Sequence, residues 1–230
     1  MNASSAGEPT GEPTVDQILA RYKEAVGGRK AWKALHSRVS MGTIDVTSMN
    51  LSGTVVMHEK APNKLLTIII LAGSAFREAF DGKTGWAEDP ADGLREETGL
   101  ELAEAKRQAD FYGPFDLRGQ YSKVAFVGRE KIGERENYVV EGSLPEGSQP
   151  DRLYFDVDTG LLARLVTQHH GPEGVSQLQE DFSDYREIDG LKLPFTISQN
   201  STESAFTIKI SQVRHNVALG DSEFSKPAVQ

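Results

Sequence analysis

The sequence predicts a mainly β fold, a long antiparallel sheet accompanied by a few helices. After one helical stretch, apolar and polar residues alternate with period two, and turn signals recur at about the 8–12-residue spacing of a meander. Asp158-Thr159-Gly160 and Asp189-Gly190 are strong hairpin signals, because Asp and Gly accept the positive φ of tight turns. No repeat or linker interrupts residues 14–230, so we expect one domain after a disordered leader at residues 1–13.

The first ordered element should be a helix that starts after Thr14. Thr14 and Gln17 form a capping-box pattern, in which each side chain bonds the other residue's backbone N–H. Gly27 and Gly28 supply the stop, and a short helical turn is expected at residues 30–35. The apolar face of the first helix comprises Val15, Ile18, Leu19, Tyr22 and Val26.

Twelve period-two segments then predict the strands of the sheet. They are residues 38–46, 51–60, 64–71, 75–81, 85–87, 123–129, 137–142, 152–157, 161–169, 175–187, 191–199 and 205–214. Pro194 inside the segment 191–199 indicates an edge or a bulge, because proline has no N–H for the ladder. The segment 64–71 is apolar on both faces and must be covered on both sides. The simplest explanation is that this segment is a central strand buried within the fold. Alternatively, a helix covers one face and another part of the sheet, a ligand or a partner covers the other.

The period-two alternation of apolar and polar residues stops between Pro90 and Gly119. Residues 100–112 are expected to form a helix, and the segment 100–117 is expected to act as a lid or a plug over the sheet.

The composition restricts the function classes. The chain has 25 Lys and Arg against 34 Asp and Glu, so its net charge of −9 would repel nucleic acid and anionic membranes. Its longest apolar run, residues 65–72, is too short to span a bilayer. With no cysteine, disulfides and thiolate chemistry are absent.

A search for catalytic and metal-binding patterns finds none. The five histidines form no HExxH pair, and His169 and His170 should point to opposite faces of a strand. No nucleotide motif and no GxSxG elbow occurs, although a Ser-His-Asp triad assembled from distant strands stays open. Residues 156–160 begin like a calcium loop but lack its closing glutamate, so a hairpin turn is the better interpretation. Solvated surface carboxylates are expected for the paired acids Glu96-Glu97, Asp181 with Asp184, and Glu187 with Asp189.

Several stretches resemble a known family. They are ILARYKEAVGGRKAWKAL (residues 18–35), FDGKTGW (80–86), YFDVDTGLLARL (154–165) and DYREIDGLKLPFTI (184–197). Together with the order of elements, they resemble the LolA/LolB-like lipoprotein-localisation superfamily, including proteins labelled outer membrane lipoprotein-sorting proteins. The resemblance spans residues 15–224. It implies a strongly curved antiparallel sheet that forms an unclosed barrel, with an N-terminal helix pair and a helical plug or lid in the concavity.

The resemblance also implies a function. Such a protein would be exported to the periplasm, with its signal peptide removed. It would take part in transport for outer membrane biogenesis by holding an acyl chain, a lipid or a lipoprotein in an apolar hollow, without catalysis, cofactor or metal. A monomer is favoured. The alternative is a non-catalytic interaction or envelope-sensor module that uses the outer surface or sheet edge of the same fold.

The hollow is expected to be lined by apolar residues of the sheet and the plug. The expected lining residues are Val55, Met57, Leu66, Ile68, Ile70, Phe76, Phe80, Trp86, Leu102, Phe111, Phe115, Phe126 and Tyr138.

Overall fold

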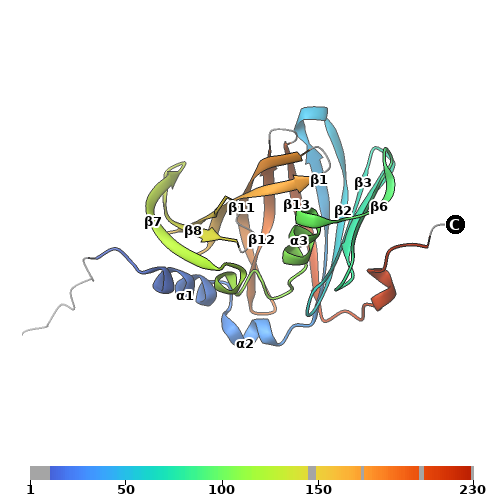
Figure 1. Cartoon of the computed structure of the whole chain (residues 1–230). Coiled ribbons are helices and arrows are strands. Elements are labelled where there is room, and N and C mark those ends of the chain that lie inside the picture. Colours follow the sequence, from blue (N-terminus) through green and yellow to red (C-terminus); the bar gives the residue numbers. More distant parts are fainter. Residues whose placement is uncertain (1–10, 145–148, 172–173, 202–204, 229–230) are drawn as a thin grey trace, which may run out of the picture.

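The fold is one antiparallel sheet of thirteen strands, curved strongly around helix α3 (Figure 1). The computed structural model describes residues 11–144, 149–171, 174–201 and 205–228. Most of the expected leader, residues 1–10, lies outside the described residues. The strand order is β6-β5-β4-β3-β2-β1-β13-β12-β11-β10-β9-β8-β7, so the edges β6 and β7 do not pair and the barrel is not closed.

The elements have the following bounds. The helices are α1 (Val15–Ala25), α2 (Gly28–Lys33) and α3 (Gly99–Gln108). The strands are β1 (Ser37–Val46), β2 (Leu51–Lys60), β3 (Lys64–Leu71), β4 (Ser74–Phe80), β5 (Gly85–Asp89), β6 (Gly93–Glu96), β7 (Lys123–Ile132), β8 (Arg135–Ser143), β9 (Asp151–Asp156), β10 (Leu162–Gly171), β11 (Gly174–Ile188), β12 (Leu191–Asn200) and β13 (Ala205–His215).

The sequence signals correspond closely to these elements. Thr14 and Gln17 form the expected capping box at α1. Asp189 and Gly190 turn the β11–β12 hairpin with φ of 53° and 80°. Pro194 lies where β12 pairs with β11 alone, because the ladder to β13 begins at Thr196. One side of the strand is therefore unpaired at this point, which suits a residue that has no backbone N–H to donate.

Two expectations about residues 90–112 were wrong. Strand β6 was missed, because its four residues are too few to display an alternation. Helix α3 ends at Gln108 rather than near residue 112. The chain turns there because the Asp110 side chain accepts a hydrogen bond from the backbone N–H of Tyr112.

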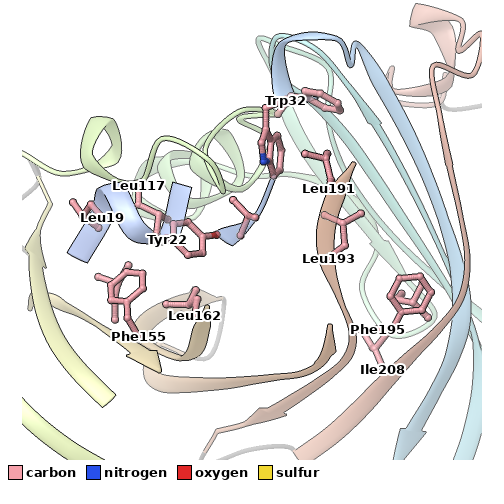
Figure 2. Close-up of a cluster of buried hydrophobic side chains, with 14 of the residues drawn as sticks. Leu19, Tyr22, Trp32, Leu117, Phe155, Leu162, Leu191, Leu193, Phe195 and Ile208 are labelled. Carbon is pink, nitrogen blue, oxygen red and sulfur yellow. The ribbon is translucent and has the colours of Figure 1, made fainter. Parts of the chain in front are cut away.

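The largest hydrophobic cluster, here called the base core, joins α1 and α2 to the sheet and extends along the inner face as far as Val46 and Val55. Leu19 and Tyr22 of α1 are directed at Phe155 and Leu162 of the sheet (Figure 2). The rings of Tyr22 and Phe155 lie edge to face with centroids 5.4 Å apart. Such aromatic pairs add to the burial of apolar area, so the base core joins the helices firmly to the sheet.

The first half of strand β3, around Leu65 and Leu66, is covered on both faces, as its sequence required. On the inner face, Leu65 packs with Phe80 and with Ala105 of α3. On the outer face, the C-terminal segment lies against the strands and places Phe224 over the sheet (Figure 1). Phe224 is 0% exposed, and its carbonyl accepts a hydrogen bond of 2.9 Å from Trp86 Nε1. The second cover is therefore a distant part of the same chain.

Candidate functional site

An apolar surface runs across the inner face of the sheet at the end away from α1 and α2. The pairings Gly53 with Leu71 and Ile69 with Phe76 place the side chains of Leu71, Ile69 and Phe76 on one face, in neighbouring strands. We call this surface the apolar wall; it consists of Leu51, Met57, Ile69, Leu71, Phe76 and Phe206. All six side chains are at least partly accessible, and Phe76 is 38% exposed. The concave face thus presents apolar area that the protein itself leaves uncovered.

A small cavity lies beside the wall, between α3 and strands β4, β5, β6 and β10. Its volume is about 100 Å³. We call it the carboxylate pocket, and its lining residues are Glu78, Ala87, Arg95, Glu97, Glu101, Glu104, Ala105, His169 and His170. Four carboxylates share this space with one guanidinium and two imidazoles.

Two of the four carboxylates have cationic or N–H partners. Arg95 donates two hydrogen bonds, of 2.9 and 2.7 Å, to Glu101. Glu104 lies 2.9 Å from Nδ1 of His169 and accepts a 3.0 Å hydrogen bond from the backbone N–H of His170. Burial by itself would raise the pKa of Glu104, but these two contacts outweigh it and the pKa is lowered.

The other two carboxylates, Glu97 and Glu78, have no ion-pair partner among the described residues. Glu97 is 4% exposed, and its Oε2 has no hydrogen-bond partner in the part of the chain that the structure describes. Burial, with the nearby Glu78 and Glu101 carboxylates, raises the pKa of Glu97 to about 8. Glu78 is reached by solvent but lies inside the concavity, where desolvation and then Glu104 raise its pKa.

Gly85 makes the position of Glu97 possible. A Cβ atom at residue 85 would lie 2.3 Å from Oε2 of Glu97, too close for any side chain. The backbone N–H of Glu97 also donates to the carbonyl of Gly85 at 3.0 Å. Glu97 is therefore held against β5, with its carboxyl at the wall of the pocket.

A second, wider cavity of about 620 Å³ lies along the other side of α3. Its lining is mixed: Leu100 and Ala103 contribute apolar area, while Lys106, Arg107 and Gln168 are polar. Here α3 is anchored by Arg107, which donates to the fully buried Asp151 at 2.5 Å. The hydroxyl of Tyr121 donates to the same carboxylate at 3.0 Å.

The expected lining residues are distributed over four places. Val55, Met57 and Phe76 lie on the inner face, where Val55 is completely buried and Met57 and Phe76 are accessible. Phe80 and Leu102 pack between the sheet and α3. The residues within the base core are Phe111, Phe115, Phe126 and Tyr138. The residues on the outer face are Leu66, Ile68 and Trp86, which pack around the C-terminal segment, and Ile70, which is 40% exposed.

The carboxylate pocket was not predicted, and the expectation that Glu97 is a solvated surface residue was wrong. The structure buries Glu97 because β6 and α3 fold it back over β5. A signal was present: Glu97, Glu101 and Glu104 follow one another at the spacing of one helical face, next to Ala105, which packs inward. An acidic stripe beside a packing residue suggests burial rather than a solvated face.

Two further findings bear on the chemistry of the site. Across the described ranges, no group of three or more His, Asp or Glu side chains is arranged to hold a metal ion. In the same part of the chain, no helix has the length and apolar character needed to cross a membrane.

Comparisons with known proteins identify the fold. No protein-family model and no curated protein sequence matches the chain. Three solved structures are similar over most of their length. A DUF1329 family protein from Desulfovibrio piger ATCC 29098 has 15% identity and a TM-score of 0.59, over 93% of this chain and 98% of that one. A putative outer membrane lipoprotein-sorting protein domain from Vibrio parahaemolyticus has 15% identity and a TM-score of 0.57, over 91% and 95% of the two chains, and a LolA superfamily protein from Nitrosomonas europaea has 14% identity and a TM-score of 0.59, over 94% and 99%. The LolA-like fold expected from the sequence is therefore confirmed; likeness at this level of identity concerns the fold alone.

Proposed function

We propose that this protein is a non-catalytic binding or carrier protein of the bacterial periplasm, which holds an acyl chain, a lipid or a lipoprotein in the concavity between the sheet and α3. The observation that carries the proposal is the apolar wall. Contiguous apolar area on a concave face, left accessible by the protein's own side chains, is the usual form of a site for an apolar ligand.

The energetics of such a site suit a chain-like ligand. Each methylene moved from water onto the wall stabilises the complex by about 0.8 kcal/mol before the ordering cost is subtracted. The wall has residues on strands β13, β2, β3 and β4, so several methylenes can contact it at once. The name of the Vibrio parahaemolyticus protein, a putative outer membrane lipoprotein-sorting protein domain, supports lipoproteins as one class of cargo.

Release of the cargo is assigned in this proposal to α3. Apart from Leu102, Ala105 and Ala109, its attachments to the sheet are the ion pairs and hydrogen bonds of Glu101, Glu104 and Arg107. Arg95, Arg107 and His169, the partners in these links, are partly exposed, so water can replace the contacts at a smaller cost than in a fully buried pair. A lid attached in this way can open while the base core stays folded.

The test compares two substitutions that differ only in the face they alter. Phe76→Glu places a charge on the apolar wall, and Ile70→Glu places one on the outer face of the neighbouring strand. The two side chains are matched in exposure, 38% and 40%, so their effects on folding should be similar. Uptake of Nile red, a neutral apolar dye, and lipid retained in native mass spectra of protein purified from bacterial cells, are the measurements.

We expect Phe76→Glu to weaken probe binding by about tenfold or more, since burying the new charge opposes binding. Ile70→Glu should bind like the unmodified protein. Equal effects of the two substitutions, or a ligand-free mass with no uptake of probe, would contradict the carrier proposal and favour an interaction module that uses the outer surface.

A further inference from the structure

Two residues that line the carboxylate pocket each have a buried polar atom without a hydrogen-bond partner among the described residues. One is Oε2 of Glu97, and the other is Nε of Arg95. Buried polar atoms are nearly always satisfied in folded proteins, so two orphans in one cavity indicate that something else completes the site. Glu78, the remaining carboxylate without an ion pair, faces the same space.

The pocket adjoins the apolar wall along β4. Phe76 of the wall and Glu78 of the pocket are two residues apart on β4, on the same face and about 7 Å from each other along the strand. Ile69 and Thr67 on β3 repeat this change from apolar to polar in the neighbouring strand. A ligand that lies on the wall therefore reaches the carboxylates with its end.

We propose that the carboxylate pocket receives a primary ammonium head group, so that the ligand is a cationic or zwitterionic amphiphile with its apolar chain on the wall. This inference rests on the proposed function and names the class of ligand. The carboxylates of Glu97 and Glu78 accept from the ammonium, and the guanidinium of Arg95 lies in the same lining.

The chemistry of the lining favours a primary ammonium over the alternatives. An anionic head group would meet four carboxylates and one guanidinium that is already paired with Glu101. A quaternary ammonium is usually held by the faces of Trp, Tyr or Phe rings, and the lining among the described residues contains no Trp, Tyr or Phe. A metal ion lacks a suitable group of ligands in the described residues. The volume of about 100 Å³ holds a head group but not a whole lipid.

Protonation of the pocket should be linked to binding. Several titratable and charged groups surround Glu97, namely Glu78 from β4, Arg95 from β6, Glu101 and Glu104 from α3, and His169 and His170 from β10. Because the pKa of Glu97 is raised to about 8, the carboxyl is largely protonated at neutral pH when no cation is near. An ammonium that binds the carboxylate must displace this proton, so its affinity should fall as the pH decreases from 8 to 6.

The experiment compares three amphiphiles with the same chain and different heads: dodecylamine, dodecanol and dodecanoate. Each is titrated, below its critical micelle concentration, against the full chain loaded with Nile red, and displacement of the dye gives its affinity. We expect dodecylamine to bind about tenfold or more tighter than dodecanol at pH 8. Dodecanoate should be the weakest, and only the affinity of dodecylamine should fall toward pH 6.

Glu97→Gln keeps the shape of the side chain and removes its charge. It should reduce the preference for dodecylamine to within about twofold of dodecanol and leave the affinity for dodecanol unchanged. Glu78→Gln, at an accessible position, is the second variant should Glu97→Gln fold poorly, and it should lose part of the preference. Glu88→Gln is the matched control, because Glu88 lies on the outer face of β5, paired with Arg77; it should keep the full preference.

The outcomes separate the two proposals. Equal affinity for the amine and the alcohol, or a preference that survives both Glu97→Gln and Glu78→Gln, overturns the head-group inference and leaves the carrier function standing. Failure of all three amphiphiles to displace the dye overturns the carrier function, and the head-group inference with it.

Discussion

The two ends of the concavity are built by different physical means. At the base core, α1 and α2 meet the sheet through buried aliphatic and aromatic side chains, such as Tyr22 against Phe155. Around α3, much of the contact is made by ion pairs: Arg95 with Glu101, Arg107 with Asp151, and His169 with Glu104.

This difference indicates which contacts of the fold need more free energy to separate. Separating the base core would expose large apolar area to water, which is strongly unfavourable. Separating α3 would exchange polar contacts for water contacts at a much smaller net cost. We therefore expect stability to depend on the base core and on the outer cover, and the α3 region to be the part that adapts to a ligand.

The largest effect is expected from Phe155→Ala. Phe155 is almost completely buried in the base core, so its loss removes transfer energy and leaves a cavity. The free energy of unfolding, measured by chemical denaturation, should fall by about 3–5 kcal/mol. Phe76→Ala, at an accessible inner-face position, should lower it by no more than about 1 kcal/mol. Similar losses at both positions would remove the distinction between the base core and the wall.

Phe224→Ala tests the outer cover of β3. The side chain is buried over Leu66 and Trp86, so its removal should lower the free energy of unfolding by about 2–4 kcal/mol. The fluorescence of Trp86 should shift to the red as water reaches it. Phe224→Leu, which keeps most of the volume, should lower the free energy by about 1 kcal/mol. An unchanged stability would mean that the C-terminal segment contributes no cover.

Asp151→Asn tests the anchor of α3. It removes the charge that Arg107 contacts in the interior, and about 2 kcal/mol of stability should be lost, less than for a fully buried pair because Arg107 is partly exposed. Amide exchange in α3 should accelerate more than in α1. The matched control is Glu136→Gln in the exposed pair with Arg129, expected within about 0.5 kcal/mol of the unmodified protein. Uniform acceleration in α1 and α3 would argue against a separable lid.

The last effect, expected from Glu97→Gln, differs from the others because it depends on pH. The pKa of Glu97 is about 8 in the folded state against 4.5 for the ordinary group, so the folded protein binds the proton more tightly than the unfolded chain does. Its contribution to stability is complete below pH 4.5 and is lost as the pH rises toward 8, at a slope of at most about 1.4 kcal/mol per pH unit.

Unfolding free energies measured across this range should therefore decrease with pH in the unmodified protein. The decrease should be shallower in Glu97→Gln. Parallel curves for the two proteins would show that Glu97 does not titrate as the buried position requires.

Much of the fold could be predicted because its signals are local. The capping box of Thr14 and Gln17, the Asp189-Gly190 turn and the alternation in residues 51–60 each depend on neighbours within a few residues. The residues of the site were harder to predict from the sequence. Leu66 and Trp86 were expected in the hollow, but their position on one face or the other depends on register and on the sense of the curvature, which composition does not encode.

The sequence by itself determined the antiparallel meander, the positions of its turns and the need to cover β3 on both faces, because these follow from backbone geometry and side-chain alternation. Only the tertiary structure decided which covers are used, α3 inside and the C-terminal segment with Phe224 outside. It also decided that Glu78, Glu97, Glu101 and Glu104 share one pocket. The physical reason is that these residues come from separate elements, and their burial and charge depend on contacts that form only when the sheet curves around α3.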